Sequence, residues 1–307
     1  MTFKNLDGSG PQPPGVVFRW AVLDKLSGRR RKSPDAAEVP FVKTDPRAVA
    51  LPPAVGEPAR LTWLGHASWL VQLDGLSLLI DPIFGERISY VVKRNCPVPL
   101  QAAELPRIDA TLITHGHYDH YDKPSVLAAG ARVLLGTGLD PSLKLPRTAL
   151  GWWDAERLSD TVRVSFVPSQ HWSRRGPFDA NKALWGGFVI EGSKSRVYHA
   201  GDTAYFAGFS EIGARYPGID SALLPIGAYD PEWFMAKQHM NPEQAVQAYV
   251  DLKARDFFAM HWGTFKLTDE PLQEPAERLR AEWARRVLPD EKLHLLAVGE
   301  SAVTVPA

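Results

Sequence analysis

Three histidines and one aspartate stand within six consecutive residues, in the run His-Gly-His-Tyr-Asp-His at positions 115–120. The run directly follows an apolar segment, residues 110–114, which is typical of a buried β-strand. Extended backbone points His115 and His117 to the same side, and Asp119 and His120 come one tight turn later. Zinc is bound by imidazole nitrogens and carboxylate oxygens. The run therefore predicts a fold that places a metal site at the end of a strand, with room for two neighbouring ions.

The remaining candidate ligands also follow predicted strands. His171 comes after residues 161–167, Asp202 after 196–200 and His261 after 257–260. Taken singly, each has an ordinary structural role as an alternative, a hydrogen-bonded histidine or a turn carboxylate. Two zinc ions need more ligands than the four of the first run. The three additional residues together supply them.

Composition limits the other classes of function. The only cysteine, Cys96, excludes an internal disulfide framework and a cysteine-based zinc site. Lys+Arg 35 against Asp+Glu 35 gives a formal net charge of zero, which argues against nucleic acid as a partner. Neither a signal peptide nor a stretch long enough to cross a bilayer is visible. We expect a cytoplasmic protein.

Two segments differ in character. Residues 1–56 contain frequent prolines and predict an extended N-terminal arm, whereas residues 57–307 predict the main domain, which carries the candidate metal ligands. Within the arm, residues 15–26 predict a short amphipathic helix with Phe18, Val22, Leu23 and Leu26 on one side, followed by a basic run at 29–32. The helix either packs on the domain or lies on anionic lipid at the inner membrane face.

Hydrophobic patterns and turn signals predict the regular elements of the domain. Asp74-Gly75 is typical of a tight hairpin, and Asn241 with Pro242 predicts the start of a helix over 241–252 whose apolar face is Ala245, Val246, Tyr249 and Val250. A second helix is predicted over 274–287. Early strands followed by αβ units predict two sheets packed face to face with helices outside. The predicted strands are 61–72, 76–80, 110–114, 132–135, 161–167, 187–190, 196–200, 221–224, 257–260, 294–297 and 302–305.

The order of the candidate ligands resembles that of the metallo-β-lactamase superfamily. Longer matches resemble the N-acyl-phosphatidylethanolamine-hydrolysing phospholipase D family within it. These matches are the segments 63–67, 81–84, 168–172, 181–186, 200–203, 225–229, 233–235 and 261–265. The resemblance implies an αββα sandwich of two mixed sheets with two zinc ions at the sheet edges. It also implies that His115, His117 and His171 bind one ion, that Asp119, His120 and His261 bind the other, and that Asp202 bridges both.

The expected chemistry is hydrolysis of a phosphodiester by a metal-bridging hydroxide, because zinc lowers the pKa of bound water to about 7. In the resembled family the products are N-acylethanolamine and phosphatidic acid. A lactonase or a general phosphodiesterase acting on a small soluble substrate would use the same site. A diiron enzyme is disfavoured, because His117 stands where such proteins usually carry a carboxylate. A metal-supported scaffold would need only four ligands. A homodimer is left open.

Substrate contacts are predicted around the metal site. The resemblance implies that Gln238 and His239 face the substrate, and His239 could hydrogen-bond a phosphate oxygen or the leaving group. We therefore count Asp119, Asp202 and His239 as catalytic candidates. Tyr118 and Tyr229 are candidates for lining the substrate pocket, with core packing as the alternative. His66 is expected to be a buried hydrogen-bonded residue behind the ligands.

Overall fold

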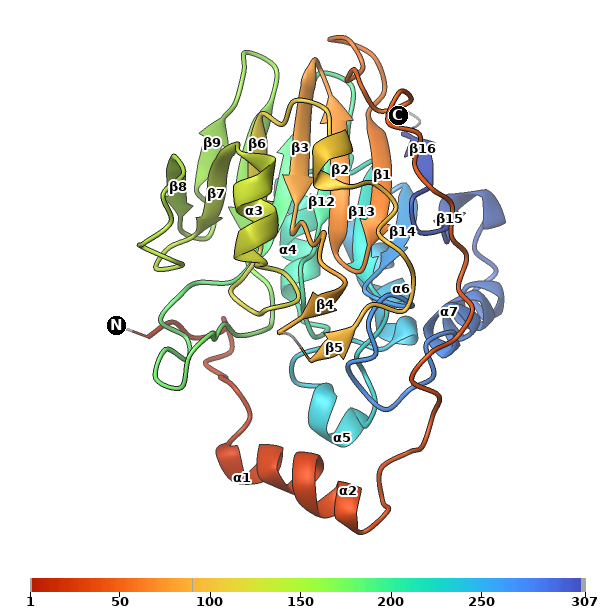
Figure 1. The fold of residues 1–307 in the computed structure, drawn as a ribbon. Coiled ribbons are helices and arrows are strands. Elements are labelled where there is room, and N and C mark those ends of the chain that lie inside the picture. Colours follow the sequence, from red (N-terminus) through yellow and green to blue (C-terminus); the bar gives the residue numbers. More distant parts are fainter. Residues whose placement is uncertain (1, 90, 305–307) are drawn as a thin grey trace.

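Two seven-stranded mixed sheets pack face to face with helices on both outer faces (Figure 1). The computed structural model describes residues 2–89 and 91–304. The order in the first sheet is β16-β1-β2-β3-β6-β7-β8, and in the second β15-β14-β13-β12-β11-β10-β9. Large apolar side chains fill the space between the sheets, among them Trp63, Trp69 and Phe258. This arrangement confirms the predicted αββα sandwich.

The strands are short. The first sheet consists of β1 (Arg60–Gly65), β2 (Ser68–Leu73), β3 (Leu76–Ile80), β6 (Ala110–Ile113), β7 (Arg132–Gly136), β8 (Arg147–Leu150) and β16 (Ser301–Val303). The second consists of β9 (Ala155–Arg157), β10 (Arg163–Val167), β11 (Gly187–Glu191), β12 (Arg196–His199), β13 (Ser221–Pro225), β14 (Asp256–Met260) and β15 (Leu293–His294). A separate ribbon pairs β4 (Arg87–Ile88) with β5 (Val92–Lys93).

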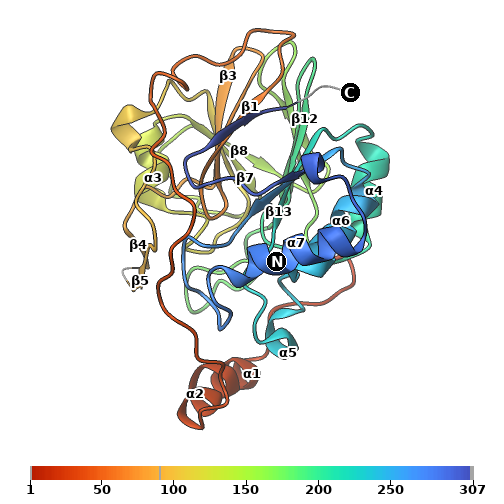
Figure 2. The same cartoon turned by 90° about the vertical axis from the view of Figure 1, so that its right-hand side faces the viewer.

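Helices cover the outer faces unequally. The first sheet carries α3 (Lys123–Ala129), while α4 (Gly208–Arg215), α6 (Pro242–Leu252) and α7 (Glu274–Arg285) lie on the second sheet (Figure 2). The short α5 (Glu232–Met235) lies below them, and Ala102–Glu104 and Asp290–Lys292 form single 3-10 turns. The described helices are all too short or too polar to span a bilayer.

Helix α6 begins where the sequence predicts. The Asn241 side chain accepts the Gln244 N–H, and the Gln244 side chain accepts the Asn241 N–H, which satisfies two amides that the helix itself leaves free. Its buried face differs from the prediction at one position. Val250 is 42% exposed, and the buried residues Ala248 and Leu252 extend the face instead.

Several strand predictions were wrong in detail. The predicted strand 61–72 is two strands, because the chain reverses at Gly65 and His66, which both have positive φ. The hairpin at Asp74-Gly75 is confirmed, with Leu73 paired to Leu76. Strand 294–297 ends at His294, and of 302–305 only the part up to Val303 is strand, Val305 lying outside the described residues. The prediction missed β4, β5, β8 and β9, which are short and partly exposed, as well as helices α3, α4 and α5.

One edge of the sandwich collects the ends of parallel strands. In the first sheet β3, β6 and β7 run parallel. Strand β1 has the same direction, because β2 between β1 and β3 is antiparallel to both. In the second sheet β12, β13 and β14 are parallel, and β10 shares their direction through the antiparallel β11. Loops that leave the carboxyl ends of these strands within each sheet therefore meet at one edge.

The N-terminal segment runs along the outside of the domain (Figures 1 and 2). Residues 14–26 are helical, as α1 (Pro14–Phe18), a π-helical turn (Arg19–Leu23) and α2 (Asp24–Leu26). Trp20 faces the domain and stacks on Phe234 of α5, with ring centroids 4.9 Å apart.

The basic run that follows this helix is partly used by the domain. Arg30 Nε donates to Asp269 at 2.8 Å, and Arg31 Nη1 donates to Glu274 at 2.9 Å. Arg30 and Arg31 therefore take part in packing the segment on the domain, which is one of the two expected alternatives, and lipid contact of the basic run stays a prediction. By contrast, Phe18, Leu23 and Leu26 are 55%, 51% and 81% exposed.

Candidate metal centre

All seven residues predicted as metal ligands lie together at the edge where the parallel strands end. His115, His117, Asp119 and His120 follow β6, His171 follows β10, Asp202 follows β12, and His261 follows β14. Their ligand atoms fall into two groups, within each of which every pair lies within 4.8 Å, and Asp202 and His261 also form a third such group with His239. One group contains His115, His117, His171 and Asp202, and the other contains His66, Asp119, His120 and His261.

Hydrogen bonds behind the first group decide which ring nitrogens are free. Thr114 Oγ1 donates to Asp81 Oδ2 at 2.6 Å, so it can only accept from His115 Nδ1, 3.0 Å away. His171 Nδ1 lies 2.8 Å from the Gln238 carbonyl oxygen, which also can only accept. Both imidazoles therefore carry their proton on Nδ1 and present a bare Nε2, which is the state in which histidine binds metal.

These two bare nitrogens face a third. His115 Nε2 and His171 Nε2 lie 2.8 Å and 3.2 Å from His117 Nδ1. A single proton on His117 Nδ1 could satisfy only one of them, whereas a metal ion would accept all three lone pairs. Burial also lowers the pKa of His117 to about 4 and holds the pKa values of His115 and His171 well below their usual range. Three neutral imidazoles in this arrangement fit a metal ion.

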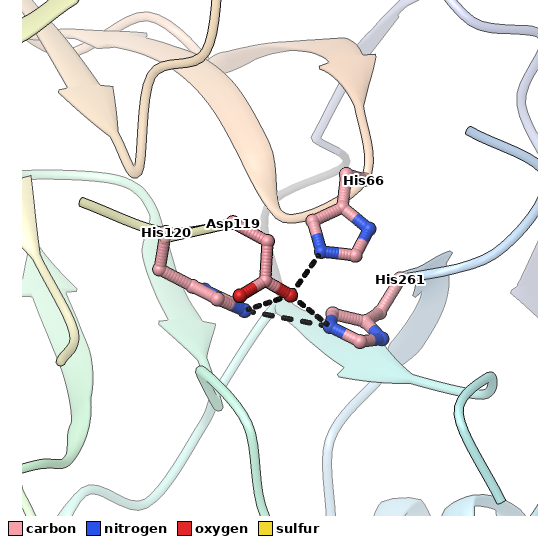
Figure 3. Close-up of side chains that lie close together, drawn as sticks. All are labelled: His66, Asp119, His120 and His261. Carbon is pink, nitrogen blue, oxygen red and sulfur yellow. Dashed lines mark hydrogen bonds and ion pairs between the residues drawn. The ribbon is translucent and has the colours of Figure 1, made fainter. Parts of the chain in front are cut away.

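The second group surrounds the carboxylate of Asp119 (Figure 3). Asp119 Oδ2 lies 3.7 Å from His120 Nε2 and 3.8 Å from His261 Nε2. His66 Nε2 lies 3.0 Å from the same oxygen, and its ring packs against that of His261 with centroids 3.9 Å apart. His120 Nδ1 is held by Asp81 Oδ2 at 2.7 Å, which directs His120 Nε2 into the group. This donor set also fits a metal ion.

Asp202 lies between the two groups. Its Oδ1 is 3.0 Å from His261 Nε2, and its Oδ2 is 3.2 Å from His120 Nε2. The same Oδ2 is 3.8 Å from His171 Nε2 and 3.9 Å from His115 Nε2. A carboxylate in this position can contribute to both groups.

Charge distinguishes the second group from the first. Burial opposes protonation of His261 and His120, but Asp202 and Asp119 outweigh it, raising the pKa of His261 to about 9 and that of His120 well above its usual range. The same pairing outweighs burial at both carboxyls and holds their pKa values well below the usual range. Protons on the two histidines thus balance the carboxylates when no metal is bound. Metal binding at neutral pH must displace these protons.

The predicted substrate contacts are not equally supported. His239 lies beside the candidate ligands. Its Nδ1 is 3.9 Å from Asp202 Oδ2, and its ring centroid is 5.1 Å from that of His171. Gln238 contributes its backbone carbonyl to His171, while its side-chain Nε2 points to the Met235 sulfur at 3.5 Å. A contact between the Gln238 side chain and substrate stays a prediction.

The two tyrosine candidates also differ. Tyr118 is 45% exposed, and its hydroxyl donates to the Arg175 carbonyl oxygen, so it lies at the rim of the site. Tyr229 is buried, its hydroxyl donates to Glu274, and Arg278 lies over its ring. Because its polar atom is already engaged, the geometry does not support Tyr229 as a substrate contact.

Asp81 is the main residue of the site that sequence reasoning missed. It is fully buried at the end of β3, next to β6, and it accepts from Thr114 N, Thr114 Oγ1 and His120 Nδ1. The sequence signal was available, since a carboxylate directly after a predicted strand is the same signal that identified Asp202.

Comparisons with known proteins agree with this geometry. A family described as a beta-lactamase superfamily domain matches residues 77–262. N-acyl-phosphatidylethanolamine-hydrolyzing phospholipase D 1 of Caenorhabditis elegans is 34% identical over 265 residues, covering 78% of this chain and 74% of that protein. The mitochondrial protein of the same name from Saccharomyces cerevisiae is 34% identical over 250 residues, covering 74% of this chain. The match spans only 52% of the yeast protein's length.

Solved structures show the same fold at lower sequence identity. Igni18, a metallo hydrolase from the archaeon Ignicoccus hospitalis, aligns with a TM-score of 0.61 and 23% identity. The alignment covers 80% of this chain and 98% of Igni18. At this identity the likeness concerns the arrangement of strands and helices only.

Proposed function

The chain belongs to the metallo-β-lactamase superfamily of metal-dependent hydrolases, and from this premise we propose that it is a zinc-dependent phospholipase D. The proposed substrate is N-acyl-phosphatidylethanolamine, and the proposed products are N-acylethanolamine and phosphatidic acid. The observation that carries the proposal is the position of Asp202, whose Oδ1 lies 3.0 Å from His261 Nε2 of the second group and whose Oδ2 lies 3.8 Å from His171 Nε2 of the first group.

A two-ion site follows from the donor sets. His115, His117 and His171 would hold one zinc ion and Asp119, His120 and His261 the other, with Asp202 between them. When bound, the two ions would activate a water molecule and neutralise negative charge on a phosphodiester. Such a site needs no side-chain nucleophile.

The chain's own residues would orient the substrate. Burial lowers the pKa of His239 to about 4, so its imidazole is neutral at pH 7 and can donate one hydrogen bond to a phosphate oxygen or to the leaving group. Because a neutral imidazole offers no net charge, the attraction for the phosphate comes from the metal ions. His239 would then fix the orientation of the phosphate.

Two observations favour a lipid over a small soluble phosphodiester or a lactone. The relatives in worm and yeast are named for hydrolysing N-acyl-phosphatidylethanolamine. In addition, the helical segment 14–26 exposes Phe18, Leu23 and Leu26, and large apolar side chains clustered on one surface element are characteristic of membrane contact. We therefore propose that this segment rests on the bilayer that contains the substrate.

The bond that is cut can be tested with isotopically heavy water. Hydrolysis of N-acyl-phosphatidylethanolamine in ¹⁸O water is expected to place ¹⁸O in phosphatidic acid, because the oxygen of water attacks phosphorus. Mass spectrometry of both products measures this. Label in the N-acylethanolamine, or turnover of lactones but not of phosphodiesters, would contradict the proposed reaction.

The lipid contact can be tested by replacing Phe18, Leu23 and Leu26 together with serine. Full burial of such side chains contributes about 1.5–3 kcal/mol each, so even partial insertion should make vesicle binding at least about tenfold weaker in the triple variant. Flotation with vesicles measures binding, and a short-chain soluble phosphodiester reports the metal site, which should be unaffected.

Val287→Ser is the matched control, because Val287 is 87% exposed just beyond α7. Vesicle binding that is the same in the triple variant and in this control would limit the segment to packing on the domain. That result would favour the soluble-substrate alternative.

A further inference from the structure

The loop that carries His171 is held by residues from the N-terminal segment of the chain. Asn5 is buried, and its Oδ1 accepts the backbone N–H of His171 at 3.1 Å and the indole N–H of Trp185 at 3.0 Å. The Trp185 indole also donates to the Ser169 carbonyl oxygen at 3.1 Å. The His171 amide therefore depends on Asn5 more than Trp185 does.

Further contacts from the same segment lie on both sides of His171. On one side, Gln170 Nε2 donates to Asp7 Oδ2 at 2.7 Å and to Ser9 Oγ at 3.0 Å. On the other, the Phe3 N–H donates to the Asn181 carbonyl oxygen at 2.8 Å, and Asn181 Oδ1 accepts from Ser173 N at 3.2 Å.

These contacts continue into the loop of the first metal-ligand run. Ser173 Oγ accepts the N–H of Gly116, the residue between His115 and His117, at 3.1 Å. The N-terminal segment is thereby linked through Asn181 and Ser173 to the backbone that presents two other ligands of the first group.

The segment is preorganised for this role. Residues 5–9 form a closed turn, which we call the Asn5 turn: Asn5 N donates to Ser9 O at 3.2 Å and Gly8 N donates to Asn5 O at 2.9 Å. Asn5 Nδ2 donates to Ser9 Oγ at 3.2 Å, which fixes the orientation of the amide so that Oδ1 points to His171. The oxygen of Asn5 is thus oriented by contacts within the turn.

We propose that the Asn5 turn positions His171 for metal binding and that Asn5 is the residue through which it acts. A buried amide without an acceptor is unfavourable, so without Asn5 the backbone at His171 would shift toward other partners. His171 Nε2 would then leave its place beside His117. The inference rests on the proposed metal site but not on the phosphodiester substrate, and the Asn5 turn lies outside the matched domain at 77–262.

The test compares metal binding by full-length variants. Asn5→Leu removes the acceptor at similar size, whereas Asn5→Asp keeps an acceptor oxygen for both donors and can accept from Ser9. Gln12→Ala is the matched control, because Gln12 also ties the segment to the domain, at the Phe234 carbonyl oxygen, but not to the His171 loop. His171→Ala identifies the ion in question.

Zinc content, chelator competition and the visible absorption of the Co²⁺-loaded protein are the readouts. The Co²⁺ absorption band that is missing in His171→Ala reports the ion bound by His171. In Asn5→Leu, half-saturation of this band should need a Co²⁺ concentration about tenfold higher or more. Tenfold is the lower end of the loss of metal affinity on removing an outer partner of a ligand. Asn5→Asp and Gln12→Ala should stay within about twofold of the unaltered protein, a difference too small to reflect loss of such a partner.

Two outcomes would overturn the inference: metal affinity of Asn5→Leu equal to that of the unaltered protein, or an equal defect in Asn5→Asp, which would assign the effect to packing. If Asn5→Leu shows no thermal unfolding transition, Asp7→Ala with Ser9→Ala decides. This double variant removes the contacts to Gln170 and should weaken binding of the same ion by a smaller factor. Unchanged metal binding would contradict a role of the Asn5 turn. Unaltered protein that binds fewer than two ions would instead contradict the proposed function.

Discussion

Alanine at position 202 is expected to reduce turnover by well over a hundredfold and to lower zinc content toward one equivalent or less. Asp202 lies within 4 Å of histidines from both groups, with Oδ1 3.0 Å from His261 Nε2 and Oδ2 3.8 Å from His171 Nε2, so its loss removes one donor from each group. Losing an outer partner of a metal ligand already costs about 10–100-fold, and the loss of a shared ligand should exceed that. In the metal-free variant, the positive charges on protonated His120 and His261 would also lose the buried carboxylate that balances them.

Elemental analysis and initial rates on the proposed phospholipid measure this effect. Asp220→Ala is the matched control, because Asp220 is an equally buried carboxylate that pairs with Arg255 at the opposite, amino-terminal end of β13. Asp202→Ala protein that keeps two zinc equivalents and most of its activity would remove the basis for the two-ion site.

Asparagine at position 81 is expected to weaken zinc binding by about 10–100-fold, because Asp81 orients a ligand from behind. Asp81 accepts three hydrogen bonds, and an amide has only one oxygen to replace the two. If that oxygen stays on Thr114 N, the amide NH₂ faces His120 Nδ1. His120 would then move its proton to Nε2 and lose the lone pair that faces the metal.

Isothermal titration of the metal-free protein with zinc measures the change. Asp74→Asn serves for comparison, since Asp74 is also buried and accepts from Gly56 N, Ser193 N and Ser193 Oγ in a turn away from the ligands. It should lose stability but not zinc affinity. Equal zinc affinity in Asp81→Asn and the unaltered protein would mean that His120 keeps its orientation without this carboxylate.

The sequence carried most of the metal site because its signals are local. Each predicted ligand follows a strand within a few residues, and parallel strands end at a common edge, so strand prediction together with the family resemblance brought His171, Asp202 and His261 to the first run. Helix α6 was predictable for a similar reason, since Asn241, Pro242 and Gln244 form a complete start signal within four residues.

What the sequence could not carry depends on contacts between distant segments. Asn5 meets His171 across 166 positions, and a lone asparagine among polar residues gives no local signal. The arm helix was predicted by its apolar spacing, which selected Phe18, Val22, Leu23 and Leu26. The side chain that docks is Trp20, because its partner Phe234 lies on an element the prediction missed. The turn at His66 was hidden because apolar residues continue on both sides of it.

The assignment of ligands to the two sheets has a wider consequence. Each proposed ion takes two ligands from the loop after β6 in the first sheet and one from a loop of the second sheet, His171 or His261. Each of the two ions would therefore link the loops of one sheet to those of the other. The gap they must fit depends on the thickness of the aromatic layer within, where Trp63 stacks on Trp262 at 5.8 Å and Trp69 meets Phe258 at 6.2 Å. A change in the size of any of these four rings would therefore alter the spacing between the ligands that the two sheets supply, although none of the rings contacts an ion.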